Sequence, residues 1–206
     1  MQAMEFMLCI TQPKCSNRMA IKQVRWEKPS TGWEKPSTGW VKLNTNGSAN
    51  VSSGVAGGGG LIRDDRGNWI VGYSRKIGKT NSFLAETWAL RDGLLLCIQL
   101  NLNAVMVELD AKALVDALKN PSYANTIVSS LFDDCKRLAA QIPQVSIKHI
   151  YREANRCADH LANVGSDQSL DFSFYFCPPV DLVPLVMANC QGLYFNRLCP
   201  DLLLAR

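Results

Sequence analysis

The order of strand-like and helix-like segments between residues 40 and 165 is the feature that most constrains the fold. Three strand patterns come first, and helices then alternate with two further strands. Adjacent strands joined by turns form an antiparallel meander, whereas strands separated by helices need crossovers. We therefore expect an α/β fold with a five-stranded mixed sheet flanked by helices. Strands are predicted at 41–46, in GGGGLIR, and at 69–77, 104–110 and 145–152, and helices at 82–100, 112–119, 125–142 and 155–164.

The first strand shows the alternation of a half-buried strand. In VKLNTN, Val41, Leu43 and Thr45 share one face, and Lys42, Asn44 and Asn46 share the other. The glycines at 57–60 lead into a strand without a following Gly-Lys-Ser/Thr, which excludes a phosphate-binding loop. We expect them to mark close packing or a bulge.

The ends of two helices carry capping signals. Ser82 is available as the cap of the first long helix, and Asn155 as the cap of the last one, which Gly165 is expected to close.

The chain divides into three parts. Residues 26–32 (WEKPSTG) are repeated letter for letter at 33–39, and their Pro, Gly, Ser and Thr content is typical of a linker. We predict a flexible segment with this linker at 1–39, one globular domain at 40–165, and an apolar extension at 166–206. The extension is apolar enough that it should pack on the domain or on a partner.

Composition excludes several classes of protein. The chain has 8 cysteines and 2 histidines, and no CxxC pair, so a structural zinc site is not expected. The N-terminus resembles neither a signal peptide nor a spanning helix. We expect an intracellular protein, nuclear or cytoplasmic, not secreted and without a membrane partner, whose cysteines are thiols. The Asn-x-Ser triplets at Asn46 and Asn50 would accept glycans only on a secretory route.

Three acids occupy positions where sites are commonly built. Glu86 lies inside the first long helix, Asp110 ends an apolar strand, and Asp159 lies one turn into the last helix. From the pattern alone, solvated surface acids remain the commoner explanation.

Five sequence blocks change this interpretation. KLNTNGS, GGGGLIRDDRG, LAETWAL, VELDAKALVDAL and HIYREANRCADHLA occur in this order between residues 40 and 165. Together they resemble the ribonuclease H-like domains of plants, which are similar to the terminal ribonuclease H domain of non-LTR retroelement polyproteins. The resemblance implies an Asp, Glu, Asp, Asp set, of which the last three fall on Glu86, Asp110 and Asp159.

The resemblance implies a metal-dependent hydrolase. Such a site holds two Mg²⁺ ions about 4 Å apart, with Mn²⁺ as a substitute, and hydrolyses the RNA strand of an RNA/DNA hybrid. Hard divalent ions prefer carboxylate oxygens. His149 stands ten residues before Asp159, where active relatives often carry a histidine that helps the product leave. Alternation from Val145 would place His149 on the apolar side of its strand, which favours a structural role.

Asn46 stands where the family has its first aspartate. An amide offers a metal one neutral oxygen and an NH₂ group that cannot coordinate a cation. We therefore expect weak metal pairing and severely reduced hydrolysis with the fold retained. The Asn46-Gly47 dipeptide is also prone to deamidation, which would restore an aspartate in some molecules.

Two alternatives remain open. The chain could be a binding module that keeps a nucleic-acid-recognising surface without chemistry, or a retroelement-derived remnant. The basic residues near the site fit either reading, since Arg152 and Arg156 suit phosphates but also an ordinary solvated turn.

Overall fold

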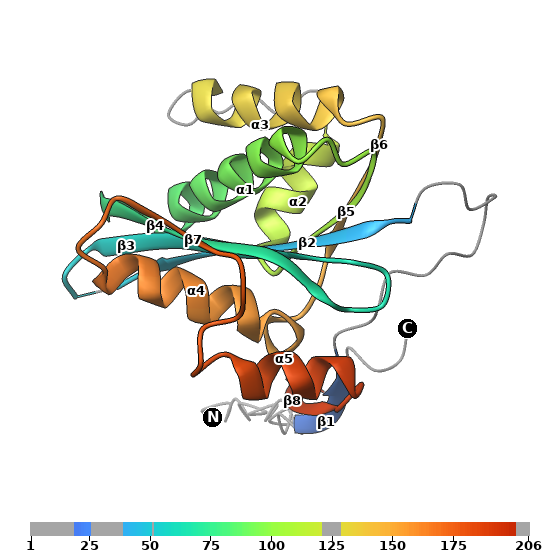
Figure 1. The fold of residues 1–206 in the computed structure, drawn as a ribbon. Helices are drawn as coiled ribbons and strands as arrows, with labels where there is room; N and C mark the ends of the chain where they lie inside the picture. Colours follow the sequence, from blue (N-terminus) through green and yellow to red (C-terminus); the bar gives the residue numbers. More distant parts are fainter. Residues whose placement is uncertain (1–18, 26–38, 51, 121–128, 201–206) are drawn as a thin grey trace, which may run out of the picture.

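A computed structural model describes residues 19–25, 39–50, 52–120 and 129–200. Eight strands, five α-helices and one 3₁₀ turn occur among these residues (Figure 1). In chain order they are β1 Met19–Val24, β2 Val41–Ala49, β3 Val55–Arg63, β4 Trp69–Lys79, α1 Ser82–Gln99, β5 Ala104–Leu109, α2 Lys112–Lys119, α3 Ser129–Gln141, β6 Gln144–His149, η1 Arg152–Ala154, α4 Arg156–Asp167, β7 Phe172–Tyr175, α5 Val183–Cys190 and β8 Phe195–Pro200.

The five predicted strands form one mixed sheet, as expected. The order is β6-β5-β2-β3-β4-β7, in which β2, β3 and β4 are antiparallel and β2, β5 and β6 are parallel. The sixth strand, β7, was not predicted and comes from the C-terminal extension. It pairs with the edge of β4, where the Phe172 ring stacks on Tyr73 at a centroid distance of 5.7 Å.

Both faces of the sheet are covered by helices. Helices α1, α2 and α3 lie on one face and α4 lies on the other, with α5 beyond it (Figure 1). The prediction that β2 is half-buried is therefore wrong. Lys42, Asn44 and Asn46 are buried, as are the apolar residues that alternate with them.

The glycines of β3 bring α4 directly onto the sheet, which confirms the prediction of close packing. A Cβ atom on Gly57 would lie 2.1 Å from the Ser166 nitrogen, and one on Gly59 would lie 2.4 Å from the Ala162 nitrogen. Gly59 is also the strand partner of Asn46. The close approach of α4 to β3 therefore also brings α4 near Asn46, in the middle of β2.

Gly165 does not close α4, contrary to expectation, because the helix continues to Asp167. A Cβ atom on Gly165 would lie 2.5 Å from the Arg75 carbonyl oxygen. This glycine therefore permits helix-to-sheet contact and has no role as a terminator.

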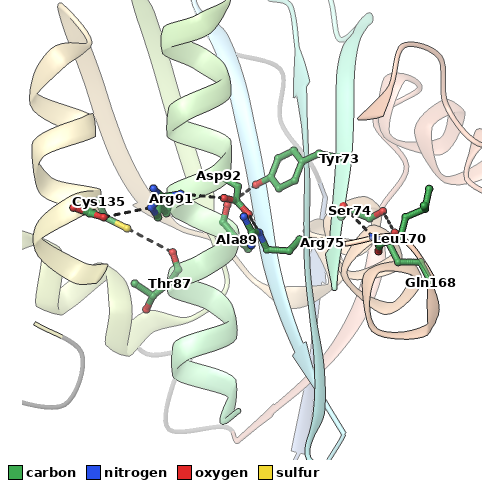
Figure 2. Close-up of polar contacts among 11 residues, drawn as sticks. Tyr73, Ser74, Arg75, Thr87, Ala89, Arg91, Asp92, Cys135, Gln168 and Leu170 are labelled. Atoms are coloured by element: carbon green, nitrogen blue, oxygen red, sulfur yellow. Dashed lines mark hydrogen bonds and ion pairs between the residues drawn. The ribbon is translucent and has the colours of Figure 1, made fainter. Parts of the chain in front are cut away.

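Helix α1 is fixed to the sheet by a buried polar network (Figure 2). The Asp92 carboxylate lies 2.5 Å from Arg75 of β4 and 3.5 Å from Arg91, and the Tyr73 hydroxyl donates to the Ala89 carbonyl at 2.5 Å. The pKa of Asp92 is raised, because the effect of burial exceeds that of the two arginines, which lower it. The network fixes the position of α1 along β4.

The cap of α1 differs from the expected one. Asn81, and not Ser82, accepts a hydrogen bond from the Leu84 backbone nitrogen at 2.9 Å. An asparagine at this position satisfies a free amide of the first turn as well as a serine does.

The terminal segments meet each other. Strand β1, inside the segment predicted as flexible, pairs antiparallel with β8 of the extension. In the extension, Leu182 at the start of α5 and Val186 within α5 pack in the same apolar cluster as Leu161 of α4. Residues 1–18, 26–38 and 201–206, with most of the duplicated WEKPSTG segment, lie outside the described residues. Within the described part of the chain, no helix has the length and apolar character needed to cross a membrane.

Candidate active site

Four of the five site residues predicted from sequence lie in or directly after four different elements. Asn46 is in β2, Glu86 in α1 and Asp159 in α4, and Asp110 directly follows β5. Strands β2 and β5 are parallel, with Thr45 opposite Leu109. The next residues, Asn46 and Asp110, therefore lie side by side where the parallel pairing of β2 with β5 ends, at the carboxyl end of β5, which is the kind of position where α/β folds build their sites.

Gly47 brings Glu86 to the same place. A Cβ atom at position 47 would lie 2.1 Å from the Glu86 backbone nitrogen, so only glycine lets α1 approach β2 this closely. The Gly47 backbone N–H also donates to the Glu86 carboxylate.

Asp159 lies against Asn46 from the opposite face of the sheet. The Asn46 amide nitrogen donates to Asp159 Oδ1 at 3.2 Å, and the Arg152 guanidinium donates to the same oxygen at 2.7 Å. The second carboxylate oxygen accepts from Asn163 at 3.4 Å, and Asn163 in turn accepts from Ser48 at 2.6 Å. Both oxygens of Asp159 are thus occupied by N–H donors.

Asn155 stands at the N-cap position of α4, as expected, but its side chain positions other elements of the site. Its side chain makes no capping hydrogen bond. It donates to the Thr45 carbonyl at 2.8 Å and to Asp110 Oδ1 at 3.3 Å, and accepts from Asn44 at 3.3 Å. One buried amide therefore ties the start of α4 to β2 and to the residue after β5.

The carboxylates share a poorly solvated space. Burial raises the pKa of Glu86 well above its ordinary value, and the charge of Asp110 raises it further. Burial also raises the pKa of Asp110, although the hydrogen bond from Asn155 lowers it. Hydrogen bonding and charge from Asp159 raise the pKa of Arg152. Glu86 Oε2 is buried and has no hydrogen-bond partner in the described part of the chain.

The residues do not fit a site for two divalent ions. Among the described residues, no three His, Cys, Asp or Glu side chains gather closely enough to hold a metal ion. Asn46 directs its NH₂ group, and not an oxygen, toward Asp159. The Arg152 guanidinium supplies the positive charge that Asp159 would otherwise take from a cation.

Among the described residues, no hydrogen bond, ion pair or ring contact joins His149 or Arg156 to this cluster. His149 is the last residue of β6 and is exposed, so the expectation that it faces the apolar side is wrong. Its ring lies edge-on against Tyr151 at 5.7 Å, and Arg156 lies over the Phe195 ring at 4.7 Å. A part for His149 in product release stays a prediction.

A buried polar network beneath the site was missed by sequence reasoning. Lys42 and Glu108 form an ion pair at 2.7 Å, and Asn44 donates to Glu108 at 3.0 Å and accepts from Arg63 at 2.8 Å. The signal was the polar half of the alternation in β2, which we interpreted as a solvent face. Through Asn44 the network reaches Asn155 and supports the site from below.

Comparisons with known proteins identify the family. The sequence model of the reverse transcriptase-like family matches residues 44–165. A protein of Arabidopsis thaliana named as a ribonuclease H protein is 36% identical over 180 residues, which cover 87% of this chain and 26% of that relative. The chain therefore spans about a quarter of the length of this relative.

Solved structures show the same architecture. The N-terminal RNase H domain of a Mycobacterium tuberculosis protein superposes with a TM-score of 0.59 at 23% identity, over 63% of this chain and 95% of that one. LC11-RNase H1, solved in complex with an RNA/DNA hybrid, gives 0.57 at 27% identity, over 62% and 96%. Because the family match covers more than half of the sequence, the chain belongs to the reverse transcriptase-like family, and its fold is that of ribonuclease H.

Proposed function

We propose that this chain binds nucleic acid, with RNA/DNA hybrid as its substrate class, and that it hydrolyses hybrid slowly or not at all. The observation that carries the proposal is the 3.2 Å contact between the Asn46 amide and Asp159, which puts an N–H donor where the family has its first carboxylate. Support for the substrate class comes from LC11-RNase H1, whose structure contains an RNA/DNA hybrid.

The chemistry of the cluster explains the expected loss of activity. Family carboxylates would take Mg²⁺, or Mn²⁺ in its place, to activate water and stabilise the leaving oxygen. Here three carboxylates remain, and one of them is neutralised by Arg152. A divalent ion would have to displace that guanidinium and accept a neutral amide as ligand, so we expect weak Mg²⁺ binding.

Recognition needs less from the cluster than hydrolysis does. A hybrid is distinguished by the 2′-hydroxyls of one strand and the shape of the other backbone, which neutral and basic groups can contact. The Arg152 side chain is 70% exposed and can meet a phosphate oxygen at the edge of the site. We place this function inside the cell, in the nucleus or cytoplasm, where free thiols such as Cys177 persist.

The test compares the native chain with Asn46→Asp. Fluorescence anisotropy measures binding of a labelled RNA/DNA hybrid without divalent ions, and gel electrophoresis measures its cleavage in Mg²⁺ and in Mn²⁺. We expect both proteins to bind and only Asn46→Asp to cleave, with Asn46→Asp/Glu86→Gln as the inactive control.

The outcomes separate the alternatives. Cleavage by the native chain at the rate of the variant would refute the proposed impairment. Binding by both proteins with cleavage by neither would identify a binding module without a catalytic site. If neither protein binds hybrid, the proposed function is wrong, and the result favours a retroelement-derived remnant.

A further inference from the structure

A pocket lies between β1, Tyr194 and the end of β6, separate from the carboxylate cluster. Its volume is about 300 Å³, within the range of small-ligand pockets. Part of the wall is formed by β1 and by Tyr194, which directly precedes β8. Strands β1 and β8 lie side by side (Figure 1), and β8 packs against η1. Both segments lie outside the family-matched residues 44–165. This wall is therefore an addition to the ribonuclease H-like domain.

Two cationic side chains of this pocket lie over aromatic rings. Lys22 lies 4.6 Å from the Tyr151 ring centre and donates to its hydroxyl at 3.1 Å. Arg25 lies over the Tyr194 ring at 4.8 Å. The Tyr194 side chain is nevertheless 52% exposed, so the ring retains surface on which another planar group can stack.

The charge of the pocket favours an anion. Lys22 and Arg25 make no ion pair with a carboxylate in the described part of the chain. The acid in the lining, Glu108, is buried and neutralised by Lys42 at 2.7 Å. Nearby Glu153 is likewise neutralised by Arg197 at 2.8 Å. Two cations beside an exposed ring are the groups that hold the phosphate and base of a single strand.

The pocket and the carboxylate cluster share one stretch of backbone. The Ile150 nitrogen donates to the Leu109 carbonyl at 2.8 Å, and Asp110 follows Leu109 directly. Tyr151 faces the pocket, while its neighbour Arg152 contacts Asp159. A nucleic-acid strand that extends from the cluster along η1 would therefore reach the pocket next.

We propose that this pocket binds an unpaired nucleotide of a single-stranded overhang that extends beyond a duplex in the candidate active site. The base stacks on Tyr194, and Lys22 and Arg25 hold the flanking phosphates. The inference rests on the proposed function, because it assumes that the neighbouring cluster binds nucleic acid.

The experiment measures anisotropy with the full chain and three probes, without divalent ions. One probe is a blunt RNA/DNA hybrid, the second carries a single-stranded overhang, and the third carries an abasic overhang of equal length. Overhangs at the 3′ and 5′ ends are tested separately. We expect the overhang with bases to bind about tenfold tighter than the blunt hybrid in one polarity, and the abasic overhang to fall between them.

Variants assign the preference to residues. Tyr194→Ala should abolish the difference between the base-bearing and abasic overhangs, and Tyr194→Phe should retain it because the ring is kept. Arg25→Gln should lower the affinity for both overhangs and reduce the salt dependence of binding by about one phosphate contact. Phe174→Ala on β7 and exposed Arg137→Ala on α3 are the matched aromatic and cationic controls, and both should keep the native ratio.

Each other outcome overturns the inference. Equal affinity for blunt and overhanging hybrids, or a preference that survives Tyr194→Ala, would show that the pocket does not take a nucleotide. Binding of an acidic phosphopeptide that depends on Tyr194, without an overhang preference, would assign it to a protein partner. Failure to bind any of the three probes refutes the proposed function, whereas binding without preference refutes only this inference.

Discussion

Asn46 of β2 and Asp159 of α4 are in contact on the face of the sheet that α4 covers, with the Asn46 amide nitrogen 3.2 Å from Asp159 Oδ1. In an active two-metal site, carboxylate oxygens at these positions would face a cation. Here the amide nitrogen and the Arg152 guanidinium, 2.7 Å from the same oxygen, perform that electrostatic role. Asp159 is thus neutralised by protein groups, and this relationship leads to the first prediction.

Asn46→Asp should make the stability of the fold depend on divalent ions. The substitution removes an N–H donor to a carboxylate and adds a like charge, at a cost of roughly 2 kcal/mol in the free energy of unfolding without metal. Mg²⁺ should recover this loss and bind more tightly than to the native chain. Urea denaturation in EDTA and in Mg²⁺, with calorimetric titration of Mg²⁺, measures both effects. Exposed Asn103→Asp is the control, and an equal response from it would contradict the prediction.

Glu86→Gln should flatten the pH dependence of stability. Burial raises the pKa of Glu86 in the folded chain, so between the unfolded and folded pKa values the folded state binds more protons. The free energy of unfolding therefore falls as pH rises from the ordinary glutamate value of about 4.3 toward the raised one. Glutamine cannot ionise, and the variant should be the more stable protein at neutral pH. Urea denaturation across this pH window tests the prediction, with exposed Asp133→Asn as the control. A slope unchanged from native would contradict it.

Lys42→Met should be strongly destabilising. It leaves the buried carboxylate of Glu108 without its ion-pair partner, which costs about 3–5 kcal/mol. Lys112→Met breaks the exposed pair with Asp116 and should cost less than about 1 kcal/mol. Chemical denaturation of both variants gives the comparison, and similar losses would mean that the Lys42 pair is not isolated from solvent.

Gly57→Ala should loosen α4 from the sheet. The added Cβ would lie 2.1 Å from the Ser166 nitrogen, which forces backbone to move at a cost of about 1–3 kcal/mol or more. Gly39→Ala has 3.8 Å to its nearest neighbour and should be close to neutral. Thermal unfolding followed by circular dichroism measures the difference, and equal melting temperatures would exclude the close contact.

Asn46 should deamidate more slowly in the folded chain than in the unfolded chain. Succinimide formation needs the Gly47 nitrogen to attack the Asn46 side chain, but that N–H is bonded to Glu86 and Asn46 lies in a buried strand. Peptide mapping after ageing with and without urea measures the fraction of aspartate at position 46. Equal rates would mean that the strand opens freely.

The five strands and four helices predicted between residues 40 and 165 could be found from sequence because their apolar periodicity is local. Where prediction failed, the cause was a contact distant in sequence. Asn155 was expected to cap α4, but it bonds the Thr45 carbonyl, 110 residues away. Likewise β7 has only four residues, and what makes it a strand is the free edge of β4 beside Tyr73.

Lys42, Asn44 and Asn46 show the limit of alternation as a signal. A polar face indicates solvent when one side of a strand is open, but β2 is central and α4 covers its second face. The alternation was correct, whereas the burial depended on how closely α4 approaches through Gly57 and Gly59.

The sequence by itself determined the order of the elements and the residue types at 46, 86, 110 and 159, because both are properties of the local chain. Only the tertiary structure decided that the Asn46 amide donates to Asp159, that Arg152 occupies the same oxygen, and that β1 and Tyr194 form part of a pocket. The first of these contacts spans 113 residues. It exists because Gly57 and Gly59 let α4 pack closely on the sheet, and no local sequence pattern encodes that approach.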